Sequence, residues 1–139
     1  MTTTPPPAPA NQLVEVWNVP FQATAWGRSK VLAGVTGLDP DGELGVPTGV
    51  IELKITEYGP GYSHTGHRHP EQVEIVIPIT GRGVTEDEHG NRREFGPGHV
   101  LYIPANSYHA NHNPFAEELR CYILKLPPTG TVDVGEAAG

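Results

Sequence analysis

The segment GYSHTGHRHPEQVE, residues 61 to 74, brings imidazole and carboxylate side chains close together in the sequence. In a strand, alternate side chains point to the same face about 6.5 to 7 Å apart, so His67 and His69 can both lean toward one ion. Glu74 follows after a turn, and His109 lies in a second histidine-rich segment. Three imidazoles and one carboxylate can surround a divalent ion and leave one or two positions for water, substrate or dioxygen. We therefore predict a metal site formed by His67, His69, Glu74 and His109.

Two further residues of this segment are candidates for proton transfer. His64 lies at the wrong spacing from His67 to be its strand neighbour, so it is either a pocket-lining acid or base or a plain loop residue. Tyr62 is the second catalytic candidate, although aromatic residues of a small barrel are more often core. The remaining histidines, His89, His99 and His112, are interpreted as surface or hydrogen-bonded residues.

The elements that must position these residues are short strands. The 17 glycines and 15 prolines divide the chain into pieces too short for ordinary helices. Apolar residues alternate with polar ones at a period of two, which is the pattern of strands. The predicted strands include Val14 and Val16, residues 51–56, 73–79, 83–86, 92–95, 100–103 and 119–126. A hairpin is expected at Gly90, because glycine supplies the positive φ of a primed turn. Together these features predict an all-β, antiparallel sandwich or barrel.

The predicted strand from Val73 to Ile79 carries two faces of different character. Glu74 shares its face with Val76 and Pro78, whereas Val73, Ile75, Ile77 and Ile79 share the other. An exposed row of four β-branched residues is rarely left to water, so a second sheet or another subunit is expected to cover it. Pro78 cannot donate to a ladder, so we expect a bulge or an unpaired edge position there.

Length and composition indicate one domain. A chain of 139 residues can bury one core, and we expect it to span residues 12–126. The Thr/Pro/Ala-rich residues 1–11 and the segment 127–139 are predicted to be flexible tails, because they have little apolar surface to offset their ordering entropy.

Charge and cysteine content indicate which classes of partner and which cellular compartment to expect. The formal net charge is −7 and no basic cluster offers a track for phosphates, which argues against nucleic acid as a partner. Cys121 is the single cysteine, so no intramolecular disulfide can form, as is common in a reducing cytoplasm. Neither a leader pattern nor a membrane-spanning apolar run is found, and we expect a soluble, unexported, cytoplasmic protein without membrane contact.

With these residues in place, the chain resembles a small single-domain cupin. The first cupin motif, G(X)5HXH(X)4E(X)6G, is matched at each fixed position by Gly61, His67, His69, Glu74 and Gly81. The second, G(X)5PXG(X)2H(X)3N, is matched by Gly98, Pro104, His109 and Asn113. Asn106 stands where the family usually has glycine, and asparagine is the residue that best tolerates the left-handed conformation of that turn.

The resemblance implies a cupin-type β-barrel, a jelly roll of two antiparallel sheets with a metal near its open end, often paired into a homodimer. Fold and site together leave three functions open. The first is a mononuclear Fe(II) oxygenase acting on a small organic substrate, with Mn, Ni, Cu or Zn as other possible ions. The second is a non-redox cyclase or isomerase of a polyketide-type pathway, in which the metal polarises a carbonyl and His64 or a tyrosine moves protons. The third is a non-catalytic protein that binds a small molecule through the ion.

Overall fold

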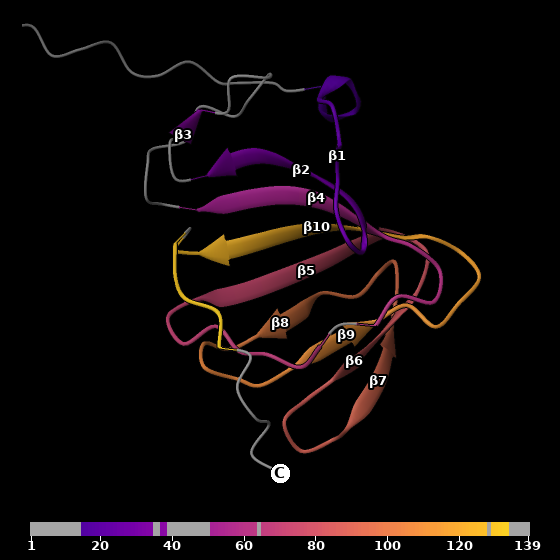
Figure 1. Cartoon of the computed structure of the whole chain (residues 1–139), viewed down its shortest axis with the longest axis vertical. Helices are drawn as coiled ribbons and strands as arrows, with labels where there is room; N and C mark the ends of the chain where they lie inside the picture. The colour runs from indigo at the N-terminus through magenta and orange to yellow at the C-terminus, as the bar shows by residue number, and fades with distance from the viewer. Residues whose placement is uncertain (1–14, 35–36, 39–50, 64, 128, 134–139) are drawn as a thin grey trace, which may run out of the picture.

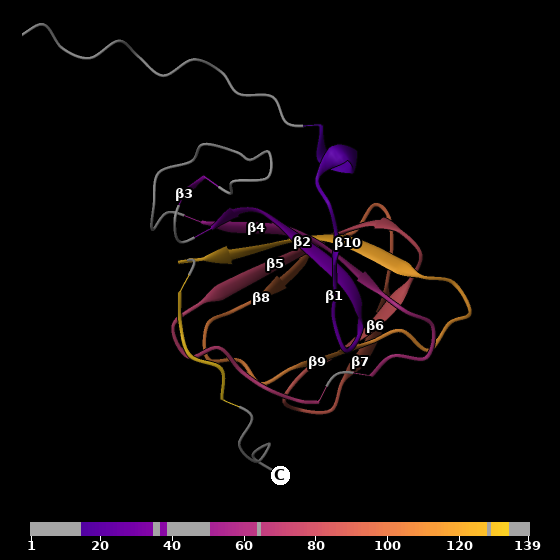
Figure 2. The same cartoon turned by 45° about the horizontal axis from the view of Figure 1, so that its top comes forward.

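Two antiparallel sheets form the protein in the computed structural model, which describes residues 15–34, 37–38, 51–63, 65–127 and 129–133 (Figure 1). The larger sheet runs in the order β1 (Gln22–Ala23), β2 (Gly27–Gly34), β4 (Glu52–Tyr58), β10 (Leu119–Leu126), β5 (Val73–Thr80) and β8 (Leu101–Ile103), with β3 (Gly37–Leu38) paired to β2. The smaller sheet runs in the order β7 (Arg92–Phe95), β6 (Gly83–Glu86) and β9 (Ala110–His112). The two sheets curve toward each other around the interior (Figure 2), as expected for a jelly-roll barrel. No helix within the described ranges is long and apolar enough to cross a membrane.

The predicted strands agree with the observed ones except near the start of the chain. Val16 belongs to a short 3-10 helix, η1 (Val16–Asn18), so its prediction as a strand residue is wrong, while Val14 lies outside the described residues. The physical reason is a tertiary contact, because the Lys30 ammonium binds the carbonyl oxygens of Val16 and Val19 and bends this segment onto the large sheet. No local sequence pattern predicts that contact.

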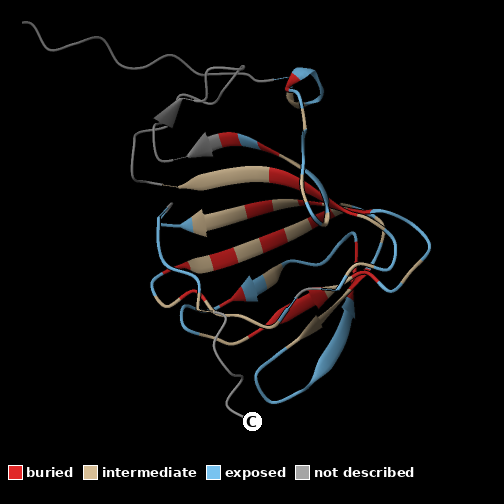
Figure 3. Cartoon of the chain, in the orientation of Figure 1, coloured by how far each residue is buried: buried red, intermediate tan, exposed pale blue. Residues whose placement is uncertain are grey.

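Strand β5 shows how alternation sorts residues between the interior and the outside. Glu74, Val76 and Pro78 are buried and alternate with half-buried residues (Figure 3). The pairing of β5 with β10 shifts register next to Pro78, between the pairs formed by Arg120 and Cys121. The irregularity expected at this proline is therefore present.

The outer face of β5 is covered only in part. Ile79 packs with Val19, Leu32 and Ile55, so residues of the chain's own N-terminal segment shield one end of the apolar row. Val73, Ile75 and Ile77 remain half-buried in the single chain. The expected homodimer stays a prediction.

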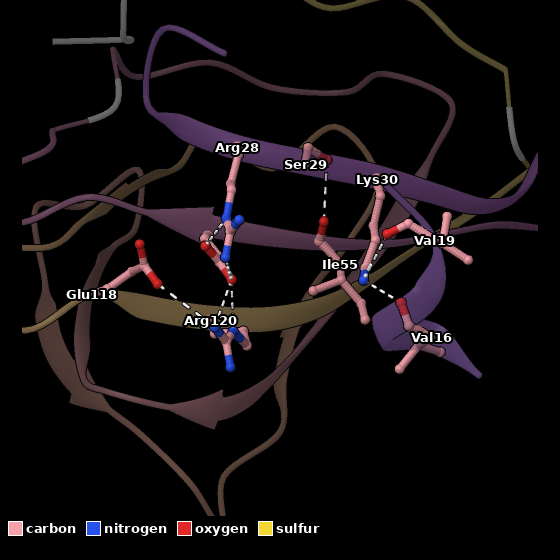
Figure 4. Close-up of polar contacts among 9 residues, drawn as sticks. Val16, Val19, Arg28, Ser29, Lys30, Ile55, Glu118 and Arg120 are labelled. Atoms are coloured by element: carbon pink, nitrogen blue, oxygen red, sulfur yellow. Dashed lines mark hydrogen bonds and ion pairs between the residues drawn. The ribbon is translucent and has the colours of Figure 1, made fainter. Parts of the chain in front are cut away.

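An ion cluster around the buried Glu57 covers the same outer face further along the sheet (Figure 4). Arg28, Glu57 and Arg120 lie side by side on β2, β4 and β10. The Glu57 side chain is fully buried and accepts hydrogen bonds from both arginines, at 2.8 Å from Arg120 Nε and 3.0 Å from Arg28 Nη2. Burial alone would raise the pKa of Glu57, but these hydrogen bonds hold it below its usual value. The cluster fixes the register of three strands and lies on the opposite face of the sheet from the histidines.

The positive φ expected at two turns is present, but the hairpin turn is not a primed one, because the Gly90 amide donates to the Asp87 carbonyl at 3.0 Å and neither residue between them has a positive φ. Asn106 has φ 63° and Gly90 has φ 79°, so each occupies the left-handed region that its turn requires. The described part of the predicted C-terminal tail lies against the first histidine segment. Asp133 pairs with Arg68 at 2.7 Å, and Glu71 accepts hydrogen bonds from Thr131.

Candidate metal centre

The two histidine segments meet through a backbone bridge. The His67 amide donates to the His109 carbonyl at 2.9 Å, and the His109 amide donates back at 2.7 Å. This reciprocal pair places the two rings with their centroids 4.4 Å apart. His69 follows two residues later, and its carbonyl accepts the Asn106 amide at 2.8 Å. The turn at Asn106 therefore holds the segment that leads to His109 against the segment that carries His67 and His69.

The predicted imidazoles are brought together. One potential ligand atom from each of His67, His69 and His109 lies within 4.8 Å of the other two. The Nδ1 atoms of His67 and His109 each lie 2.9 Å from a backbone carbonyl, of Thr65 and Ser107 respectively. A carbonyl can only accept, so Nδ1 carries a proton in both rings and leaves Nε2 as the atom available to a metal. That tautomer is the one that can bind a metal through Nε2.

Glu74 completes the group predicted from the sequence. Its Oε2 atom lies 3.5 Å from Nε2 of His69 and 3.5 Å from Nε2 of His109. Ligand atoms bound at about 2.1 Å to one ion are about 3.0 to 3.4 Å apart at angles between octahedral and tetrahedral, so the observed spacing is close to a shared coordination sphere. Glu74 Oε2 and His109 Nε2 are buried without a hydrogen-bond partner in the described protein. Buried polar atoms rarely stay unpaired, and an ion between them would satisfy both.

The electrostatics of the group suit a cation. Burial lowers the pKa of His67 and lowers that of His69 to about 4, helped at His69 by the positive charge of Lys125. Burial would raise the pKa of Glu74, but His109 and the charge of Lys125 lower it to about 2. Near neutral pH these two imidazoles are therefore uncharged and the carboxylate is ionised, which is the protonation state that a metal ligand needs. The donor set fits a divalent ion.

His67, His69 and Glu74 open onto a cavity of about 320 Å³. Its remaining lining residues are Trp26, Lys54, Thr56, Tyr58, Tyr62, Thr65, Ile123, Lys125 and Val132. Tyr62 stacks on Tyr58 with centroids 5.6 Å apart, and burial raises the pKa of both phenols, so they stay protonated near neutral pH. The predicted catalytic residue Tyr62 thus borders the candidate site.

Other predicted residues fall outside this group. His64 lies outside the described residues. His89 is exposed, His99 accepts the Gly96 amide at 3.0 Å through Nδ1, and His112 lies 3.5 Å from Glu86, so none of them belongs to the described histidine group.

Sequence reasoning missed the two cavity lysines, Lys54 and Lys125. Lys54 alternates with Leu53 and Ile55, and that alternation is normally typical of a polar outer face. Here Lys54 and Thr56 face the cavity, whereas Ile55 packs under the N-terminal segment. Glu74 was inferred to face the interior, and the strand register places Lys125 on β10 and Lys54 on β4 on that same face. This is the signal that would have identified them.

A comparison with family models agrees with this geometry. The model described as a cupin domain matches residues 54–125, more than half of the chain. The chain belongs to the cupin family. The matched residues contain every candidate metal ligand of this cupin and both cavity lysines.

Solved structures support the same fold. A cupin 2 conserved barrel domain protein from Salinispora arenicola is 26% identical, with 86% of this chain and 90% of that chain covered and a TM-score of 0.58. An uncharacterized conserved protein with a double-stranded beta-helix domain from Klebsiella pneumoniae is 13% identical, with 88% and 96% covered and a TM-score of 0.68. KdgF from Halomonas sp. is 16% identical, with 86% and 96% covered and a TM-score of 0.65. Comparison with curated proteins gives no match.

Proposed function

We propose that this cupin is a metal-dependent enzyme that acts on a small molecule in the barrel cavity. The observation that supports the proposal most directly is the convergence of His67, His69 and His109 with buried Glu74 beside them, next to a cavity of about 320 Å³ that is lined by His67, His69 and Glu74. Protonated Nδ1 atoms on His67 and His109 direct Nε2 of those rings to the ion.

An Fe(II) oxygenase is the reaction class that we place first. Histidine and carboxylate ligands with open positions are typical of non-haem iron sites, and bound Fe(II) would supply electrons to dioxygen. The chain itself would provide the enclosure. Trp26, Tyr58 and Ile123 give the cavity apolar surface that excludes water from an organic substrate, and Tyr62 can orient the substrate by donating its phenolic proton in a hydrogen bond.

A non-redox cyclase or isomerase is the second candidate, and the proton-bearing groups of the cavity favour it. Burial, together with the charge of Lys125, lowers the pKa of Lys54. An ammonium group with a lowered pKa exchanges protons more readily near neutral pH, while the Tyr62 phenol remains an acid. Such a pair could move a proton on a substrate whose carbonyl is polarised nearby.

Oxygen and metal dependence separate the two reaction classes. Protein purified without a metal-binding tag would first be analysed for its elements, then loaded separately with Fe²⁺ and with Zn²⁺. An oxygenase should convert candidate substrates only with iron and air, because Zn²⁺ cannot pass electrons to dioxygen. Undiminished product in sealed, oxygen-free vials, or full turnover with Zn²⁺, would reject the oxygenase and favour the cyclase or isomerase.

A Tyr62→Phe variant tests the role of the phenol in either class. It removes the hydroxyl and keeps the ring that stacks on Tyr58. We expect unchanged metal content and a turnover lower by about tenfold or more. Tyr102→Phe is the matched control, because Tyr102 is 58% exposed and does not line the cavity. Equal activity of wild type and Tyr62→Phe would remove Tyr62 from the proposed machinery.

A further inference from the structure

Two lysines face the same cavity as the histidines. Lys54 comes from β4 and Lys125 from the neighbouring strand β10, and both line the cavity. Lys125 lies directly across from Glu52 on β4 and from Glu74 on β5. The cavity thus has ammonium groups on the wall shared by three adjacent strands.

These ammonium groups are only partly paired. Lys54 Nζ lies 3.6 Å from Glu52 Oε1, and its side chain is 19% exposed. Lys125 has no ion-pair partner among the residues that the structure describes. Burial and the charge of Lys125 disfavour the charged form of Lys54. Two like charges in a confined, partly desolvated space are a cost that a fold without a use for them would avoid.

Charge balance indicates what relieves this cost. Without a metal ion, the two positive charges of Lys54 and Lys125 are set against the two carboxylates of Glu52 and Glu74 on the same three strands. A divalent ion adds two positive charges, and the described lining of the cavity holds no acidic residue other than Glu74. The loaded cavity would therefore be strongly positive inside a protein whose formal net charge is −7. A bound anion would compensate it.

We propose that Lys54 and Lys125 form an anion subsite that selects small organic carboxylates, oriented with the rest of the molecule toward the histidines. This inference rests on the metal-dependent function proposed above. Lys54, Lys125 and the paired Glu52 together carry one net positive charge, so a carboxylate with one negative charge balances the subsite itself, whereas a doubly charged phosphate would leave an excess negative charge there. The rings of Trp26 and Tyr62 on the cavity wall suit an unsaturated or aromatic body.

Calorimetric titration of the Zn²⁺-loaded protein tests the subsite without any turnover. The probes are benzoate, its neutral isostere benzamide, and phenyl phosphate. A charge-assisted hydrogen bond corresponds to about 10- to 100-fold in affinity, so benzoate should bind at least about tenfold more tightly than benzamide. Benzoate should also bind less tightly to the metal-free protein, and it should raise the affinity for Zn²⁺ by the same factor. Equal binding of benzoate and benzamide would overturn the proposal, and phenyl phosphate binding about tenfold more tightly than benzoate would overturn the choice of carboxylate.

Substitutions distinguish binding of the carboxylate by the lysines from its direct binding to the ion. Lys125→Met should weaken benzoate by about tenfold or more and leave benzamide within about twofold, whereas Lys125→Arg should restore most of the affinity. Lys54→Met provides a second, independent test of the subsite. Arg92→Met is the control for net charge, because the Arg92 side chain is 55% exposed on the small sheet and does not line the cavity. Undiminished benzoate affinity in both lysine variants would reject the subsite.

The thermal stability of the metal-free variants distinguishes a binding role from a structural one. In the metal-free protein Lys125 repels Lys54 and attracts Glu74, so the two effects oppose each other and Lys125→Met should shift the melting temperature by no more than about 4 °C. A marked loss of stability would assign Lys125 a structural role and overturn the proposal.

Zn²⁺ binding is measured before any probe is added. Its absence would overturn the metal-dependent function and the subsite together, whereas Zn²⁺ binding without preference for benzoate would overturn the subsite alone.

Discussion

Asn113, the last residue of the second motif, offers a sharp test of how the two motifs are joined. Its side chain is fully buried, and Nδ2 donates to the carbonyls of Glu117, Tyr58 and Gly59 at 2.8, 3.0 and 3.2 Å. Oδ1 accepts the Phe115 amide at 3.1 Å. The side chain therefore ties the end of β4 to the loop that precedes β10.

Asn113→Ala would leave these buried partners without hydrogen bonds. Each of the four lost hydrogen bonds is worth about 0.5 to 1.5 kcal/mol, so we expect a loss of about 2 to 6 kcal/mol in the free energy of unfolding. For a domain of this size that loss corresponds to a fall of about 8 to 24 °C in melting temperature. Asn91→Ala is the matched control, because Asn91 lies in the exposed hairpin turn and its side chain contacts only Asp87 in the described protein. It should change the free energy of unfolding by at most about 0.5 kcal/mol.

Asn113→Asp sharpens the test because it preserves the shape and removes the donors. An ionised aspartate would direct oxygen at the three carbonyls, so this variant should be less stable than Asn113→Ala at pH 8. Burial among carbonyls raises the pKa of a carboxyl group and disfavours its ionised form. The aspartate variant should therefore regain stability relative to wild type as the pH falls toward 5 and the carboxyl takes up a proton. Denaturant titrations at both pH values give the comparison, and an aspartate variant as stable as wild type at pH 8 would refute the donor role of Asn113.

Replacing His67, His69 or His109 by Ala should sharply lower the metal content measured by elemental analysis while circular dichroism stays that of a β protein, and full occupancy in all three would contradict the ligand assignment. In chelator-treated protein, the folded-state pKa values of His69 (about 4) and Glu74 (about 2) lie below those of the unfolded chain. The folded state thus binds fewer protons, so the free energy of unfolding should fall as the pH drops, through His69 from about 6.5 to about 4 and through Glu74 from about 4.5 to about 2. Melting curves against pH check this, and Glu74→Gln should flatten the more acidic part. Asn106→Ala should cost about 1 kcal/mol in denaturant unfolding because φ is 63° there, whereas Asn106→Gly should be tolerated, and equal stability of the two would refute strain at this turn.

The sequence by itself determined most of the strands and the motif spacing. The predicted strands 83–86, 92–95 and 119–126 match β6, β7 and β10 residue for residue, because turn glycines flank β6 and β7, and Pro127 directly follows the alternating residues of β10. The fixed spacing of the two motifs was enough to name the three histidines, although His67 lies in an isolated backbone bridge and not in one of the strands.

Tertiary structure alone decided which face of each strand became the interior and what else entered the cavity. The backbone bridge that joins His67 to His109 links residues far apart in sequence, and no local pattern encodes it. The contact of Lys30 with the Val16 carbonyl turned a predicted strand residue into part of η1. Lys54 and Lys125 line the cavity because the register of β4, β10 and β5 places them on the same face of the sheet as Glu74. Alternation reports that two faces of a strand differ, but only the packing of the second sheet and the N-terminal segment determines which of them is enclosed.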